Sequence, residues 1–206
     1  MSDNLAKNFL DDAIKTFRDY KELADKSFEQ VTDEEFFVSL DEESNSIAVI
    51  IKHMVGNMLS RWTDFLTTDG EKEWRHRDME FVMTKETTRE ELLARWEEGW
   101  RVVFGAVEPL QPEDVERIVF IRGQEHTVMK AITRQLTHYA YHIGQIVFLA
   151  KHFRSTEWKS LSIPRNRSAE FNAYLAEEVK KAGEGLERSR FKAAQDFISK
   201  SEGNKQ

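Results

Sequence analysis

The chain has 206 residues, enough for one domain with a sizeable core that needs no cross-links to fold. Its apolar fraction of 40% and charged fraction of 33% are those of an ordinary globular protein and exclude a wholly disordered chain. The net charge of −7 argues against non-specific binding to nucleic acid or to anionic lipid. The sequence has no cysteine, which excludes disulfides, thiolate ligands and a cysteine nucleophile, so any thiol used must come from outside.

The beginning of the chain mixes charged and apolar side chains at helical spacing. It contains neither the apolar run nor the cleavage site of a signal peptide. The longest mostly apolar stretch, residues 140–150, is about half the ~20 residues that a membrane-spanning helix needs. We therefore expect a soluble, cytoplasmic protein with neither a membrane nor a nucleic acid as its partner.

Four segments carry apolar residues at the spacing of an amphipathic helix. They cover residues 4–28, 47–65, 88–107 and 128–153. Thr88 and Glu91 form a capping box that marks the start of the third segment, and Pro109 stops it. Four long helices in one bundle are the most economical arrangement, so the predicted fold class is all-α.

The segments between these helices predict two further features. Residues 67–87 lose the helical period and crowd charges around Trp74 and Phe81, and a loop of ~20 residues in a compact domain is unusual unless it is functional. Residues 115–121 alternate in part and are β-branched, Arg122-Gly123 can turn, and residues 126–128 can return. We expect a long loop between the second and third helices and a short β-hairpin before the fourth.

The end of the chain is more polar. A loop with a proline leads into a short helix that Ser168 could cap, and the residues after Gly183 are charged and are expected to fray. No internal repeat and no second hydrophobic core is visible. The predicted organisation is one domain over residues 1–182 with a polar C-terminal tail over residues 183–206.

Three histidines form a candidate metal site. His138 and His142 are four residues apart, so their imidazoles lie on one helix face, near enough to share an ion. Each precedes a core position by one residue, as His53 does on the second helix, so the three could meet across the bundle. Three ligands leave one coordination position open, as in catalytic sites. The alternative is that they are core histidines hydrogen-bonded to neighbouring helices.

The other histidines are expected to be exposed or to cap an element, and they are left out of the site. They are His76, His126 and His152.

Two stretches carry a family resemblance. HMVGNMLSRW in the second helix and HYAYHIGQI in the fourth resemble the DinB-like superfamily, whose members carry one histidine on helix two and H-x3-H on helix four. RWTDFLTTDGEKEWRHRDMEF and WKSLSIPRNRSAEFN extend the resemblance to a subfamily of uncharacterised bacterial DinB-like proteins, over residues 1 to about 175. The resemblance implies an up-down-down-up four-helix bundle, a divalent metal ion bound by His53, His138 and His142, and frequently a homodimer.

The resemblance also suggests a chemistry. Some DinB-like proteins are transferases in which a low-molecular-weight thiol such as bacillithiol, mycothiol or glutathione binds near the metal and attacks an electrophile, and others are isomerases that use the same thiols. A metal-dependent transferase that activates an exogenous thiol toward a small-molecule substrate is therefore expected.

Two alternatives stay open. One is a metal-dependent hydrolase, although the residue after the first histidine of the pair is Tyr139, where a general base Glu would be needed. The other is a non-enzymatic stress-response bundle that binds a ligand and uses the metal for stability.

An all-imidazole site suits Zn or Ni first, with Fe, Co, Cu or Mn as further choices. Asn57, one turn after His53, and Gln145, three residues after His142, could orient water or substrate, or they could be ordinary polar positions beside the core. In the long loop, Trp74, Arg75, Arg77 and Asp78 could form a lid that binds an anionic thiol, or a solvated, salt-bridged segment. No catalytic residue is identified.

Overall fold

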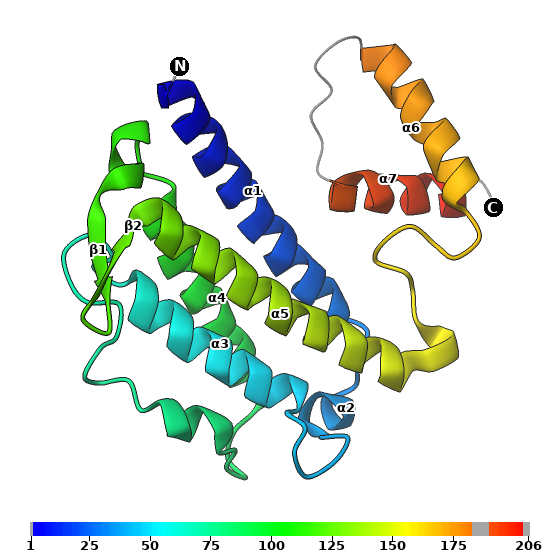
Figure 1. The fold of residues 1–206 in the computed structure, drawn as a ribbon. Helices are drawn as coiled ribbons and strands as arrows, with labels where there is room; N and C mark the ends of the chain where they lie inside the picture. Colours follow the sequence, from blue (N-terminus) through cyan, green and yellow to red (C-terminus); the bar gives the residue numbers. More distant parts are fainter. Residues whose placement is uncertain (1, 183–189, 204–206) are drawn as a thin grey trace.

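The computed structural model describes residues 2–182 and 190–203, and it is mostly helical with one two-stranded sheet (Figure 1). The helices of this part of the chain are α1 (Ser2–Phe28), α2 (Asp33–Phe37), α3 (Ile47–Trp62), α4 (Arg89–Val107), α5 (Val128–Arg154), α6 (Ser168–Ala182) and α7 (Arg190–Gly203). The strands are β1 (Ile118–Ile121) and β2 (Gln124–Thr127), and 3₁₀ turns form η1 (Arg77–Phe81), η2 (Pro112–Glu116) and η3 (Ser155–Glu157). The predicted all-α class and the hairpin before the last bundle helix are confirmed.

The long helices α1, α3, α4 and α5 form the bundle (Figure 1). The start of α4 lies at the end of α1, because Arg89 donates to the carbonyl oxygen of Phe28 at 2.6 Å. The end of α5 lies there too, because Arg154 pairs with Glu35 at 3.3 Å. Helices α1 and α5 therefore run one way and α3 and α4 the other, which is the expected up-down-down-up order.

One aromatic side chain from each bundle helix meets at the centre of the core. Phe17, Trp62, Trp100 and Tyr139 are each no more than 2% exposed. Phe17 packs edge-on to Trp62 at 6.0 Å, and Trp100 packs edge-on to Tyr139 at 5.7 Å. The Trp62 indole N–H donates to the Tyr139 hydroxyl at 2.9 Å, so the helices that carry the histidines are also joined by a buried hydrogen bond.

The long loop between α3 and α4 is a crossover connection. The two helices are neighbours that run in the same direction, so residues 63–88 must return along α3, whose 16 residues span about 24 Å. The loop is fastened to α3 near its beginning, where Ser60 Oγ and Arg61 both donate to the Gly70 carbonyl, at 2.9 and 2.8 Å. It then packs along α3 through η1.

The hairpin closes the end of the bundle where α5 begins. Arg122 and Gly123 both have positive φ, 55° and 71°, as a two-residue hairpin turn requires, and their N–H groups donate to the Asp69 carboxylate at 2.8 and 2.7 Å. The turn is as predicted. The first strand is shorter than predicted because residues 112–116 form η2, which begins with a proline.

The sequence predicted no second hydrophobic core and a frayed end, but residues 190–203 form the helix α7, which belongs to a second apolar cluster. Helices α6 and α7 pack through a small apolar cluster separate from the main core, made by Phe171, Ala193, Ala194 and Phe197. The apolar residues of α7 are few but lie on one face, which a reading of composition misses. The domain boundary at residue 182 stays a prediction, and residues 183–189 and 204–206 of the predicted tail lie outside the described residues.

Candidate metal centre

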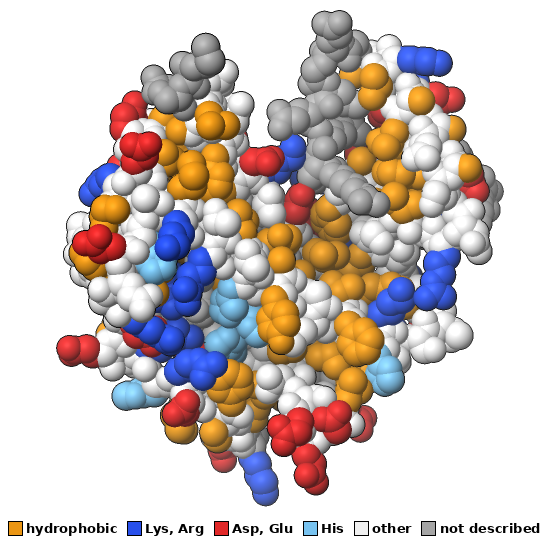
Figure 2. All heavy atoms as spheres, in the orientation of Figure 1, with side chains coloured by type: hydrophobic (Ala, Val, Ile, Leu, Met, Phe, Trp, Pro, Cys, Tyr) orange, Lys and Arg blue, Asp and Glu red, His pale blue; other side chains and the backbone are white. Residues whose placement is uncertain are grey.

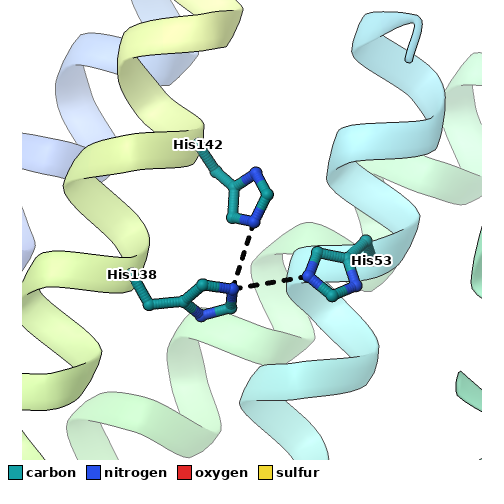
Figure 3. A group of neighbouring side chains, drawn as sticks. All are labelled: His53, His138 and His142. Atoms are coloured by element: carbon teal, nitrogen blue, oxygen red, sulfur yellow. Dashed lines mark hydrogen bonds between the residues drawn. The ribbon is translucent and has the colours of Figure 1, made fainter. Parts of the chain in front are cut away.

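Three imidazoles from two helices point toward a common centre (Figure 3). His138 Nε2 lies 3.1 Å from His142 Nε2 and 3.4 Å from His53 Nε2, and the candidate ligand atoms of the three residues all lie within 4.8 Å of one another. A tetrahedral ion with metal–nitrogen bonds of about 2.05 Å separates its nitrogens by about 3.3 Å. The predicted approach of His53 to the pair is confirmed, and the spacing fits such an ion.

The protonation of the triad also fits a metal ligand set. Burial, followed by the neighbouring histidines, lowers the pKa of His138 to about 3. Burial is likewise the main cause that lowers the pKa of His142 to about 4. Both imidazoles are therefore neutral at pH 7, and a neutral imidazole has the lone pair that a metal needs.

The outward nitrogens of two imidazoles are held by acceptor oxygens. His53 Nδ1 donates to Glu80 Oε2 at 2.8 Å, and His142 Nδ1 donates to Gln145 Oε1 at 2.8 Å. Because each Nδ1 carries the proton, each Nε2 presents its lone pair to the centre. Gln145, which the sequence suggested for water or substrate, lies against the outward side of His142.

Glu80 is a buried carboxylate, 7% exposed, that comes from the crossover loop. Arg75 donates to both of its oxygens, at 2.8 and 3.1 Å. Burial raises the pKa of Glu80, but the hydrogen bonds from His53 and Arg75 outweigh burial and hold that pKa below its usual range. Glu80 is therefore charged at neutral pH and holds the His53 proton on Nδ1.

Gly56 makes room for this carboxylate. It lies three residues after His53, on the same face of α3, and a Cβ built on it would be 2.1 Å from Glu80 Oε1. Only glycine therefore allows Glu80 to approach α3 this closely.

The chain matches the model of a family described as a protein of unknown function (DUF1572) over residues 4–167. It belongs to the DUF1572 family. This family is DinB-like, so the resemblance drawn from the histidine motifs is confirmed at that level. No curated protein matches the chain significantly.

The DUF1572 match includes the whole crossover loop, and the role of that loop as a lid stays a prediction. Arg75 forms an ion pair with Glu80 and lies 3.6 Å from Glu71, and its side chain is 3% exposed. Trp74 is 54% exposed and lines a separate hollow on the other side of Glu80. Arg77 is exposed and stacks over the Phe81 ring at 5.2 Å. The segment therefore packs beside His53 through Arg75 and Glu80, while most of its other side chains are exposed.

Sequence reasoning missed Glu80. Its only signal was Gly56, a glycine one turn after a ligand candidate in the middle of an apolar helix, which indicates the close approach of another group.

A cavity of about 490 Å³ adjoins the triad. Its walls include His53, His138 and Asn57. Asn57 is buried, and its Oδ1 accepts from Gln135 Nε2 at 2.6 Å. The structure thus places Asn57, a predicted substrate-binding residue, beside two of the three histidines.

The remaining histidines of this DUF1572 chain lie apart from the triad. His126 was expected to be exposed or to cap an element, but it is buried in β2, where its Nδ1 lies 3.0 Å from the Gln124 carbonyl oxygen. His76 and His152 are exposed. Within residues 2–182 and 190–203, His53, His138 and His142 are the one group of three or more His, Asp or Glu residues whose ligand atoms converge.

The same part of the chain contains no helix that is long and apolar enough to cross a membrane.

Proposed function

We propose that His53, His138 and His142 bind one divalent metal ion and that the protein is a metal-dependent transferase that uses an exogenous low-molecular-weight thiol as its nucleophile. The observation that carries the proposal is the convergence of three imidazole Nε2 atoms at 3.1 and 3.4 Å, with the protons of two rings held on the outward nitrogens. A bound ion would supply the positive charge that lowers the pKa of a thiol beside it.

The protein's own side chains favour a thiol over water as the nucleophile. Glu80 is the carboxylate that contacts the triad, and its oxygens are engaged by His53 and Arg75, so it is poorly placed to take a proton from water. A thiol needs less help, because its pKa is much closer to neutrality than that of water. The chain has no cysteine, so the thiol would be a second substrate.

The metal is tested first, by elemental analysis of protein purified without a chelator or a metal-affinity column. The variants are a His53→Ala, His138→Ala, His142→Ala triple mutant and His152→Ala, which removes an exposed histidine, as control. We expect about one equivalent of ion, Zn or Ni before Fe, Co, Cu or Mn, in the wild type and the control, and none in a still-folded triple variant. A wild-type protein that is empty and cannot be loaded would refute the metal site.

The chemistry is tested with chlorodinitrobenzene and a panel of bacillithiol, mycothiol and glutathione, with and without metal. A metal-dependent rate with one thiol supports the transferase. Ester turnover without any thiol would instead identify a hydrolase. If thiol, electrophile and ester panels are all silent while metal removal lowers the Tm, the protein is a ligand-binding bundle, and the transferase is refuted.

We further propose that the protein is a homodimer through the outer face of α5. Tyr141 and Phe148 on this face are 63% and 62% exposed, and hydrophobic side chains gather over α5 in Figure 2. Exposed aromatic side chains on one helix face are typical of a protein interface.

Sedimentation equilibrium tests the dimer. We expect a dimeric wild type and a monomeric Phe148→Glu variant. Val179→Glu serves as control, because Val179 is a similarly exposed apolar residue on α6, 53% exposed, and its replacement should leave the dimer intact. A monomeric wild type would refute the proposal.

A further inference from the structure

The cavity beside the triad is lined by five arginines that come from separate parts of the chain. They are Arg61 at the end of α3, Arg75 and Arg77 in the crossover loop, Arg122 in the hairpin turn and Arg134 on α5. Figure 2 shows basic side chains gathered beside histidines on this face. The chain as a whole carries a net charge of −7, so this cluster is opposite in sign to the rest of the protein.

Acidic side chains neutralise only part of the cluster. Glu80 is bound by Arg75 at 2.8 Å. Glu71 lies 3.6 Å from Arg61 and 3.3 Å from Arg122. Among the residues that the structure describes, Arg77 and Arg134 have no carboxylate within ion-pair distance, so the cavity keeps an excess of positive charge.

Arg61 is built into the wall of the cavity. It is 3% exposed, and one of its terminal nitrogens donates to the Gly70 carbonyl at 2.8 Å. Its Nε atom has no hydrogen-bond partner in the described part of the chain. Burial lowers the pKa of Arg61; Glu71 opposes this shift, while Arg75 and Arg134 add to it. Burying a guanidinium near like charges costs free energy, and a bound anion would offset that cost.

The position of the cluster connects it to the triad. Arg134 precedes His138 by four residues on α5, so the two side chains lie on one helix face about one turn apart. Arg75 and His53 hold the same carboxylate, that of Glu80. If the charged groups of a bound molecule contact the arginines, the rest of that molecule would therefore lie next to the imidazole nitrogens of the triad.

We infer that this cavity binds a small molecule with two or more negatively charged oxygen groups, the chemistry shared by polycarboxylates and phosphate esters. Guanidinium groups bind both through paired hydrogen bonds, and several of them discriminate a polyanion from a monoanion. The role of this molecule as the substrate or the thiol of the reaction rests on the proposed function, but its binding does not.

Isothermal titration calorimetry on metal-free protein, dialysed free of chelator, tests the inference without any activity measurement. The probes are citrate and pyrophosphate, with acetate as the monoanion, all at one ionic strength. We expect at least one polyanion to bind at least tenfold more tightly than acetate. The tighter of the two tells whether the pocket prefers carboxylates or phosphates.

Two arginine variants locate the binding. Arg134→Gln should weaken the better probe at least tenfold, and its fold should be retained because the Arg134 side chain is exposed. Arg101→Gln is the control: Arg101 lies on α4 with 76% of its side chain exposed, outside the cavity, and should leave binding unchanged. Circular dichroism and Tm verify that both variants fold.

Two results would overturn the inference. One is that neither polyanion binds better than acetate, and the other is that Arg101→Gln weakens binding as much as Arg134→Gln, which would indicate general charge attraction. The failure of the metal site can be told apart, because Arg134→Gln should keep its metal. If the triple histidine variant binds no metal but still binds the probe within a few-fold of the wild type, anion binding is independent of the ion.

Discussion

Replacing Gly56 by alanine should damage the metal site without touching a metal ligand. The new Cβ would be 2.1 Å from Glu80 Oε1 and 2.6 Å from Glu80 Cδ, well inside ordinary contact distance. The carboxylate would have to move away from α3 by about 1 Å, which exceeds what a hydrogen bond tolerates. Its 2.8 Å bond from His53 Nδ1 would then be lost, and His53 would be free to turn.

The magnitude follows from two opposing effects. An alanine in the middle of a helix is favoured over glycine by about 1 kcal/mol. Loss of a hydrogen bond to a buried charge costs about 1.5–3 kcal/mol. We therefore expect Gly56→Ala to lower the free energy of unfolding by roughly 1 kcal/mol. The loss of an outer hydrogen bond to a ligand histidine should weaken metal binding by roughly 10–100-fold.

The assay is competition for the metal against a chromophoric chelator, together with urea unfolding of the metal-free protein. Glu80→Gln removes the charge but keeps the shape, and it should weaken metal binding in the same way. Gly105→Ala on α4 is the matched control: its Cβ meets nothing within 4 Å, so it should stabilise the fold slightly and leave metal affinity unchanged. Wild-type metal affinity in both Gly56→Ala and Glu80→Gln would refute the assigned role of Glu80.

Other perturbations test the core, the charge state of the triad and the hairpin. Tyr139→Phe should destabilise the protein by about 1–3 kcal/mol in urea unfolding, because Trp62 Nε1 loses its buried acceptor, and an unchanged midpoint would contradict this. Metal-free protein should lose stability as the pH falls from about 6.5 toward 4, because burial lowers the pKa of His138 to about 3 and of His142 to about 4, so the unfolded state binds more protons. Urea unfolding at pH 7 and pH 5 measures the loss, and equal stabilities would refute it. Asp69→Ala should speed amide hydrogen exchange in the hairpin turn, whose two N–H groups its carboxylate accepts, and unchanged exchange would show that the turn needs no such support.

The helices could be predicted from the sequence because each buries one apolar face, and that face repeats along the chain with the helical period. An apolar residue can also pack on the core from just beyond the end of a helix. The second predicted helix was extended to Phe65 by its apolar spacing, but α3 ends at Trp62 and Asp64 adopts a positive φ of 50°. Phe65 still packs on Trp62, at 4.8 Å, from outside the helix, so its burial indicated core but not helix.

The triad could be predicted for a similar reason. His138 and His142 share a helix face, and His53 occupies the equivalent position on a helix that had to pack nearby. The groups that orient the triad were harder to predict from the sequence. Gln145 lies three residues from its partner and was noticed, although for another role, whereas Glu80 lies 27 residues after His53 in a segment without any period.

The topology explains why the missing group comes from that segment. Since α3 and α4 run in the same direction, the chain must pass back along the outer side of α3, while α5 packs on its inner side. His53 stands between the two: its Nε2 faces His138 on α5, and its Nδ1 faces Glu80 on the crossover. A crossover of this length is thus a structural consequence of the up-down-down-up order, and it brings the Glu80 carboxylate to the triad and adds Arg75 and Arg77 to the arginines of the helices.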